Sequence, residues 1–161
     1  MKTIVIGLGN PILSDDSVGV RIARELKERI ESAGQSAVEV IEMYAGGIRL
    51  MDAMEGYDRA VIIDSMITGV ERPGTLRRLS LSDLVTTRNT LSVHDMDLPT
   101  ALDMGRMLGM PLPSDVVIWG IEAKDVENFG EELTEEVEAS LSSTIEIIEE
   151  DLNFSVRQGE F

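Results

Sequence analysis

The chain has 161 residues and carries 30 acidic against 14 basic side chains, which gives a formal net charge of −16. A chain of this length suits one domain that buries about 70% of the surface exposed by its unfolded form. Hydrophobic residues make up 43% and charged residues 27%, the composition of a folded globule rather than of a disordered segment. Because the chain contains no cysteine, disulfides, thiolate metal sites and a cysteine nucleophile are excluded.

The N-terminal apolar run covers only residues 4–7, and no stretch approaches the length of a membrane span. We therefore expect a cytoplasmic protein without a membrane partner. The acidic balance argues against a nucleic-acid partner, since phosphate backbones are bound by a surplus of Lys and Arg.

The first part of the chain alternates predicted strands with predicted helices. Residues 2–7, 37–44 and 59–64 are apolar and rich in β-branched side chains, which predicts three buried strands. Apolar residues at helical spacing predict a first helix, with one face made by Val18, Ile22, Leu26 and Ile30. Ser14 or Asp15 suits its N-cap, and Gly34 suits its end. A turn at 45–47 leads into a second helix over 48–54.

The second part continues the alternation with one shorter strand. Pro73 and Gly74 begin a predicted edge strand over 75–79, and a loop leads from there to His94. A helix is expected over 98–108, a last strand over 116–121, and an amphipathic helix over 134–152 that opens at Thr134. Residues 153–161 are expected to form a frayed tail.

This element order predicts an α/β fold with three α/β/α layers around a mostly parallel, twisted, five-stranded sheet. The sheet is expected to carry one antiparallel edge strand, as in phosphorylase/hydrolase-like folds. No repeat or linker divides the chain, so we expect a single domain over residues 1–152 followed by the tail over 153–161.

Three chemically active side chains fall in loops after predicted strands. Ligands of doubly wound sheets bind beyond the carboxyl ends of the strands, at a topological switch point. Asp16 follows the first strand, Asp64 ends the third, and His94 lies in the loop after the edge strand. Asp16 could instead complement the dipole of the first helix, Asp64 could cap the next segment, and a lone histidine is more often a surface residue.

Two carboxylates and an imidazole suit a borderline divalent metal with open coordination positions. Such a trio has too few ligands for a closed structural site. The sequence thus predicts that Asp16, Asp64 and His94 contact a divalent ion that keeps coordination positions for a water or a substrate group.

A dinucleotide site is an alternative interpretation of the glycines after the first strand. Gly7 and Gly9 match the first two glycines of that fingerprint, but position 12 is Ile12. Glu42 could serve as the ribose-binding acid, whereas Asp15 and Asp16 would meet a phosphate badly.

The opening Gly7-Leu8-Gly9-Asn10-Pro11 resembles the start of bacterial peptidyl-tRNA hydrolases, whose fold is similar. That family continues with a segment that supplies its catalytic histidine. The corresponding stretch, residues 14–19, contains no histidine, and the acidic charge is wrong for a tRNA substrate.

A better match is the hydrogenase maturation endopeptidase family, which the chain resembles from residue 4 to about 152. Its G-x-G-N-x-x-x-x-D-[DE]-x-x-G element corresponds here to Gly7, Gly9, Asn10, Asp15, Asp16 and Gly19. The aspartate that ends a strand in that family corresponds to Asp64, and the Pro-Gly that follows corresponds to Pro73-Gly74. The family's histidine element corresponds to residues 92–99 around His94, and its late Gly-Ile-[EQ] element to Gly120-Ile121-Glu122. Where the family often has Asp-Gly-Gly-Thr, this chain has residues 42–45, a departure expected to affect substrate choice.

The resemblance implies an endopeptidase that removes the C-terminal extension of a nickel–iron hydrogenase large-subunit precursor. In that family, nickel already inserted into the precursor is what the protease recognises. The nickel-contacting residues carry over onto Asp16, Asp64 and His94, which would also be the catalytic residues. Nickel would therefore arrive with the substrate, and zinc or cadmium could take its place in a crystal. A non-catalytic nickel-binding chaperone with the same ligands is the alternative.

Other residues near the expected site have simpler interpretations. Asp95, Asp97 and Glu122 are expected to be solvated loop carboxylates. A group of methionines could suggest a soft-metal site, but core or interface packing is the preferred interpretation: Met96, Met104, Met107 and Met110.

Overall fold

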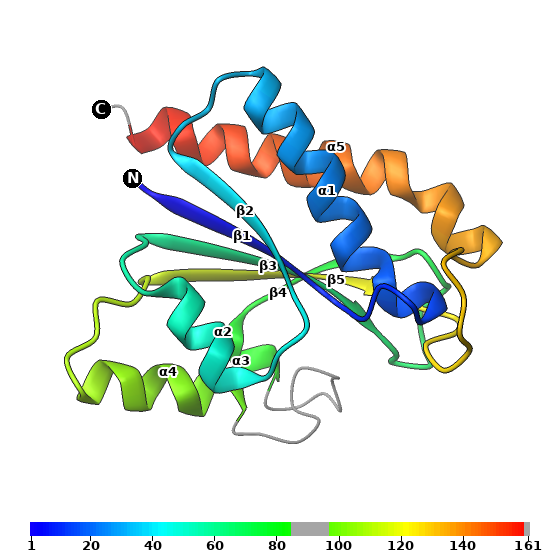
Figure 1. Ribbon diagram of the computed structural model, residues 1–161, viewed down its shortest axis with the longest axis horizontal. Coiled ribbons are helices and arrows are strands. Elements are labelled where there is room, and N and C mark those ends of the chain that lie inside the picture. The colour runs from blue at the N-terminus through cyan, green and yellow to red at the C-terminus, as the bar shows by residue number, and fades with distance from the viewer. Residues whose placement is uncertain (85–96, 160–161) are drawn as a thin grey trace.

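The computed structural model describes residues 1–84 and 97–159, with residues 84 and 154–159 described by their backbone alone. Five strands form one sheet in the order β2-β1-β3-β5-β4 (Figure 1). Four of them are parallel: β1 (Thr3–Leu8), β2 (Val38–Met43), β3 (Arg59–Met66) and β5 (Asp115–Glu122). The edge strand β4 (Leu76–Leu79) runs antiparallel to β5. The predicted fold class is confirmed.

Helices cover both faces of the sheet (Figure 1). The 3₁₀ turn η1 (Ser14–Ser17), α1 (Val18–Ser32) and α5 (Glu135–Gly159) lie over one face. The other face carries α2 (Gly47–Met54) and α4 (Leu98–Met107), with the short α3 (Leu81–Leu84) beside α4. No helix in the described part of the chain is long and apolar enough to cross a membrane.

Alternation along the central strands divides the core into two halves. In β3, Val61 and Ile63 pack with α1 and α5, whereas Ala60 and Ile62 pack with α2 and α4. Every residue of β1 and β3 is buried, as expected of parallel strands covered on both faces. This burial explains why these two strands are nearly continuous apolar runs.

Of the two predicted ends of α1, the structure confirms the second and corrects the first. The prediction of Ser14 or Asp15 as its N-cap is wrong, because these residues lie inside η1 and Ser17 precedes the first residue of α1. Ser17 makes no side-chain capping bond. Gly34 ends the helix as predicted and adopts the left-handed φ of +68° that glycine tolerates best.

The last helix is longer than the sequence suggested. We expected residues 153–161 to fray, but α5 continues as far as Gly159. Neither proline nor glycine interrupts the chain between Leu152 and Gly159, so no residue stops the helix earlier.

A close approach between α1 and the sheet depends on Gly19. A Cβ atom at this position would lie 2.3 Å from the carbonyl oxygen of Ile63 and 2.4 Å from that of Leu8. The first turn of α1 therefore rests directly on the carboxyl ends of β1 and β3. Any side chain here would push the helix, and the η1 turn before it, away from the sheet.

We expect Gly19→Ala to lower the free energy of unfolding by about 1–3 kcal/mol, the usual range for overpacking. Urea denaturation measures the change. Gly130→Ala is the control, because no atom lies within 4 Å of the Cβ that it would add. Equal stability of the two variants would contradict the close-packing role of Gly19.

Candidate active site

The carboxyl ends of β1 and β3 carry the two acidic residues that the sequence singled out. These strands are neighbours, and the chain leaves β1 toward β2 on one side while β3 lies on the other. Their shared edge is the topological switch point at which ligands bind in such sheets. Asp64 lies in β3 and is buried, and Asp16 lies half-buried in η1.

Hydrogen bonds connect these two acids through Ser65. The Ser65 hydroxyl donates to Asp16 Oδ1 at 3.1 Å, and the Ser65 amide donates to Asp64 Oδ1 at 2.8 Å. Asp16 Oδ2 accepts a further hydrogen bond from the backbone amide of Asn10 at 2.9 Å. Two of the three predicted site residues therefore come together, from segments nearly fifty residues apart.

The loop after β1 packs closely against the backbone of Asp16 at Gly9. Gly9 has a φ of +149°, and a Cβ atom on it would lie 2.0 Å from the carbonyl oxygen of Asp16. The loop after β1 and the η1 turn are thus in direct backbone contact. The glycine of the sequence motif serves to place Asp16 over the end of the sheet.

His94 lies outside the described residues, so its meeting with Asp16 and Asp64 stays a prediction. Asp95 and Met96 lie in the same segment, 85–96. Within residues 1–84 and 97–159, no group of three His, Cys, Asp or Glu side chains is placed to hold a metal ion.

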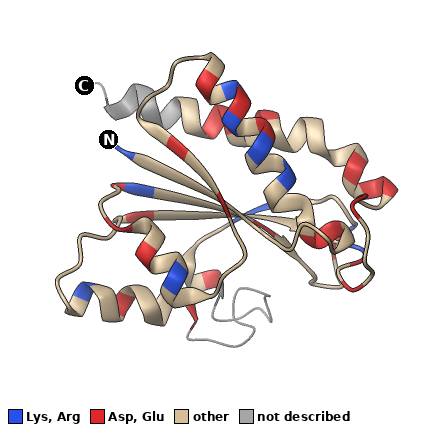
Figure 2. Ribbon diagram, in the orientation of Figure 1, with Lys and Arg blue, Asp and Glu red and all other residues tan. Residues whose placement is uncertain are grey.

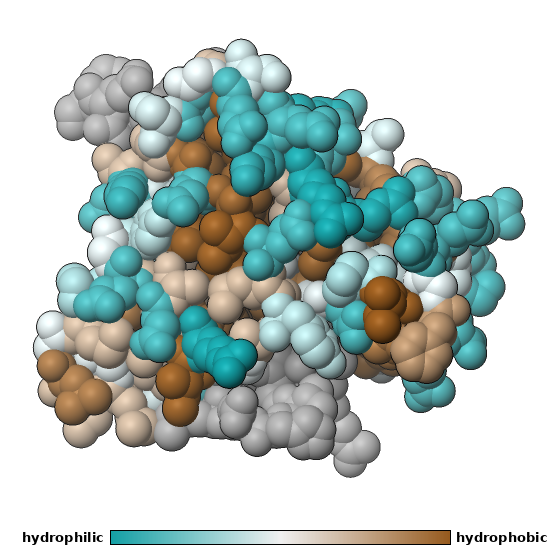
Figure 3. All heavy atoms as spheres, viewed as in Figure 1, coloured by the Kyte–Doolittle hydropathy of each residue, from teal (hydrophilic) through white to brown (hydrophobic). Residues whose placement is uncertain are grey.

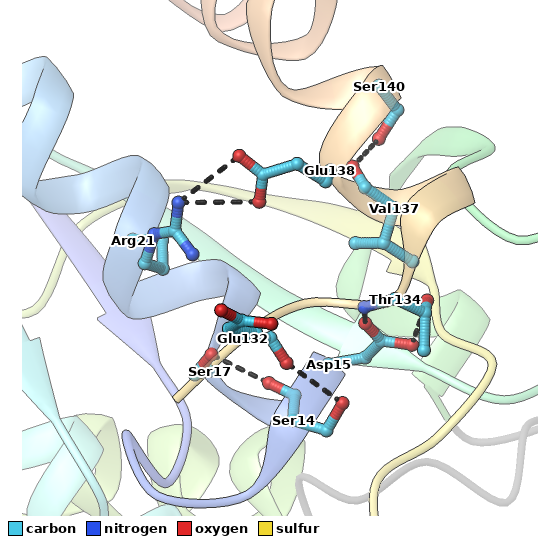
Figure 4. A network of polar contacts seen from close by, with 9 residues as sticks. All are labelled: Ser14, Asp15, Ser17, Arg21, Glu132, Thr134, Val137, Glu138 and Ser140. Carbon is cyan, nitrogen blue, oxygen red and sulfur yellow. Dashed lines mark hydrogen bonds and ion pairs between the residues drawn. The ribbon is translucent and has the colours of Figure 1, made fainter. Parts of the chain in front are cut away.

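Asp15, next to Asp16 in the sequence, has a different role (Figure 4). Its side chain is fully buried and accepts four hydrogen bonds, all from the loop between β5 and α5. The donors are the amides of Lys124, Asp125 and Thr134 and the hydroxyl of Thr134, at 2.7–3.0 Å. The Asp15 amide also donates to the carbonyl of Asp125. Asp15 therefore ties η1 to this loop.

Glu122 was expected to be a solvated loop carboxylate, and this prediction is wrong. Its side chain is only 2% exposed at the end of β5. Glu122 Oε1 accepts bonds from the amides of Thr68 and Gly69 and from the Thr68 hydroxyl, at 2.9–3.1 Å. It therefore holds the loop that follows Asp64. The sequence holds a signal for this role, because Glu122, like Asp64, is a carboxylate at the end of a buried strand.

Asp97 is exposed, as expected, but it also has a structural role. Its Oδ1 accepts a hydrogen bond from the Thr100 amide at 2.9 Å and caps α4. That bond holds the pKa of Asp97 below its ordinary value. Met110 packs against the core, while Met104 and Met107 are exposed on α4.

The dinucleotide interpretation finds no support at the residues that it would need. Glu42 forms a two-bond ion pair with Arg24, at 2.7 and 3.1 Å. The Asn10 amide, in the loop where a phosphate would lie, donates to Asp16 instead. A second anion at this place would face the Asp16 carboxylate.

Comparisons with known proteins agree with one another. The family model described as hydrogenase maturation protease matches residues 20–151. The hydrogenase 2 maturation protease of Escherichia coli (strain K12) is 30% identical over 150 residues, which cover 91% of this chain and 87% of that protein. The HupD hydrogenase expression/formation protein of Bradyrhizobium diazoefficiens is 26% identical over 91% of this chain and 75% of its own length.

Solved structures show the same similarity. The hydrogenase maturating endopeptidase HybD from E. coli superposes with a TM-score of 0.78 at 26% identity, covering 96% of this chain and 94% of that one. The maturation protease HycI from Thermococcus kodakarensis KOD1 gives 0.71 at 22% identity over 94% and 92%, a likeness of fold.

We expect Asp15→Asn to lower the free energy of unfolding by about 2–4 kcal/mol, because its amide group would face buried N–H donors that need an acceptor. Asp16→Asn is the matched variant and should cost about 1 kcal/mol or less, since Asp16 is half-buried and accepts only the bonds from Asn10 and Ser65 in the described structure. Urea denaturation of both variants measures the difference. Equal losses would contradict the separate roles of the two acids.

Glu122→Ala should loosen the loop after Asp64. We expect the Thr68 and Gly69 amides to exchange their hydrogens at least about tenfold faster, because their shared acceptor is lost. Hydrogen exchange followed by NMR measures this rate, with exposed Glu28→Ala as the control. Unchanged exchange at both amides would refute the role of Glu122.

Proposed function

Because this chain belongs to the hydrogenase maturation protease family, we propose that it removes the C-terminal extension of a nickel-loaded large-subunit precursor of a nickel–iron hydrogenase. The family match covers most of the chain, and the resemblance predicted from its motifs is confirmed. Its relatives and structural neighbours are endopeptidases, so the reaction class is peptide-bond hydrolysis. The proposal adds the substrate and the residues that recognise it.

The observation that carries the proposal is the joining of Asp16 and Asp64 through Ser65 at the sheet edge. The two donors described for Asp16, the Asn10 amide and the Ser65 hydroxyl, are both neutral. Neutral donors orient a carboxylate without cancelling its charge. Asp16 can therefore still attract a cation, and the adjacent carboxylate of Asp64 adds to the negative potential at the same place.

We propose that the cation is the nickel held by the substrate. Asp16, Asp64 and His94 would contact it, and three such ligands leave coordination positions for the groups that the precursor supplies. A set of this kind binds a free ion weakly and favours one delivered by a partner. Contact with nickel would then occur only after the precursor has been loaded.

Docking on the nickel would place the scissile peptide bond beside the two carboxylates. Hydrolysis adds one water across the bond: its oxygen attacks the carbonyl carbon, and the nitrogen of the leaving peptide gains a proton. One of the two carboxylates would accept the proton of the attacking water as general base. The nickel can polarise the carbonyl oxygen while it anchors the substrate. We expect this step to occur in the cytoplasm.

The substitutions Asp16→Asn, Asp64→Asn and His94→Ala should each slow processing of the nickel-loaded precursor at least about 100-fold, the scale of a general base or of an electrostatic contact to the reacting group. Loss of the C-terminal peptide, detected by mass spectrometry of the large subunit, measures the rate. Asp103→Asn, whose side chain is 76% exposed on α4, is the control and should process normally.

Nickel-free precursor should remain unprocessed under the same conditions, and adding nickel during its maturation should restore cleavage. Binding of the loaded precursor without a change in its mass would contradict the protease function and favour a nickel-binding chaperone. Undiminished cleavage by His94→Ala would remove this residue from the site.

A further inference from the structure

Large apolar side chains are exposed preferentially around the candidate site. In the described part of the chain, six of them follow the carboxyl ends of β1, β2, β3 or β5: Ile12, Tyr44, Ile48, Ile67, Val70 and Phe129. This is the edge that carries Asp16 and Asp64. Apolar side chains gathered at one edge of a soluble protein indicate an interaction surface rather than random exposure.

Two of these exposed residues, Ile12 and Phe129, come from segments whose backbones lie side by side although 117 positions separate them. Leu13 and Phe129 form an antiparallel bridge, and the Gly130 amide donates to the carbonyl of Ile12 at 2.9 Å. Ile12 is 51% exposed and Phe129 is 82% exposed. Figure 3 shows a small apolar patch enclosed by hydrophilic residues at this end of the molecule.

The segment that carries Phe129 is held firmly. The Asp15 carboxylate binds the amides of Lys124 and Asp125 at its start. The Asp125 carboxylate then accepts bonds from the Asn128 side chain and amide and from the Glu127 amide, which together lower its pKa. An exposed aromatic residue on a preorganised loop loses little conformational entropy on binding, which is typical of an interface anchor.

The same patch is joined to the candidate site through Asn10. The side-chain oxygen of Asn10 accepts the Ile12 amide at 3.2 Å, while its own amide donates to Asp16 at 2.9 Å. A partner seated on Ile12 and Phe129 is therefore positioned relative to Asp16 by a single short loop. A partner bound to the patch would therefore hold its neighbouring segment at a fixed position relative to Asp16 and Asp64.

Acidic residues surround the patch and restrict the kind of partner. Glu127, Glu131 and Glu132 are exposed on either side of Phe129, and Figure 2 shows acidic residues in this loop and at the start of α5. A symmetric dimer through the patch would bring these like charges face to face, which is unfavourable. The complementary surface is instead an apolar pocket bordered by Lys or Arg.

We propose that Ile12 and Phe129 form the anchor that docks the hydrogenase large-subunit precursor, by inserting into an apolar pocket flanked by basic residues on that substrate. This inference rests on the proposed function, since it identifies the precursor as the occupant. The anchor supplies affinity and registers the scissile segment over Asp16 and Asp64, but it takes no part in the bond-breaking step.

Steady-state processing of purified nickel-loaded precursor tests the anchor. Phe129→Ser and Ile12→Ser should each raise KM at least about tenfold while kcat stays within about twofold of the original value. Leu108→Ser is the matched control: Leu108 is 78% exposed, but it follows α4 at the opposite edge of the sheet, and its KM should not change. Equal KM values for Phe129→Ser and the unaltered chain would overturn the proposal.

Binding without turnover separates this proposal from the proposed function. The Asp64→Asn chain, immobilised and exposed to the same loaded precursor, should bind at least about tenfold more weakly when Phe129→Ser is added. Binding of the loaded precursor by the unaltered chain without any cleavage would refute the protease function and leave the anchor standing, provided that Phe129→Ser weakens that binding. Absence of any binding, or dimerisation that Phe129→Ser abolishes, would overturn the anchor.

Charge reversal tests the chemistry of the partner. Glu131→Lys combined with Glu132→Lys should weaken binding about tenfold at low salt and flatten its dependence on ionic strength. Glu28→Lys combined with Glu31→Lys, two exposed positions on the distant part of α1, changes the net charge by the same amount and should leave both the affinity and its dependence on ionic strength unchanged. An equal effect of the two charge reversals would contradict a basic border around the substrate pocket.

Discussion

The buried carboxylate of Asp15 is the interaction on which the functional end of the molecule depends. It joins the η1 turn to the loop between β5 and α5 through four hydrogen bonds, with no exposure to solvent. A buried carboxylate that lost these donors would be strongly destabilising, so the two segments cannot separate without a large cost. This contact therefore fixes the positions of Asp16, in the η1 turn, and of Phe129, in the loop between β5 and α5. Asp15 thus has a structural role, whereas its neighbour Asp16 is the residue proposed to act in the site.

A second buried carboxylate, that of Glu122, fixes the loop that follows β3 on the other side of the site. Glu122, at the end of β5, holds the backbone of Thr68 and Gly69 and so closes the loop that begins just after Asp64. Both supporting acids lie at this end of the sheet: Asp15 is in the η1 turn after β1, and Glu122 is the last residue of β5. Among the acidic residues that the structure describes, Asp15, Asp64 and Glu122 are buried, and the others are exposed or half-buried.

The fold could be predicted from the sequence because apolar runs and helical spacing reflect burial directly. Strands β1 and β3 are continuous apolar segments, and Pro73-Gly74 marked the edge strand. The start of α1 was misplaced because Ser14 and Asp15 fit a capping pattern equally well, and only the distant Thr134 reveals what Asp15 binds. Glu122 was misjudged for the same reason, since its partners lie over fifty residues away. The proximity of Asp16 and Asp64 could be predicted because strand ends are recognisable from the local sequence. Phe129 could not be found in this way, because a lone exposed aromatic carries no periodic signal.

The central claim is that Asp16, Asp64 and His94 converge on nickel held by the substrate. Nickel K-edge X-ray absorption tests it most directly, recorded on loaded precursor made resistant to cleavage, alone and bound to this chain. We expect binding to add nitrogen or oxygen ligands to the nickel, and the added nitrogen to disappear with His94→Ala. A nickel spectrum that is identical in the free and bound precursor would contradict the claim.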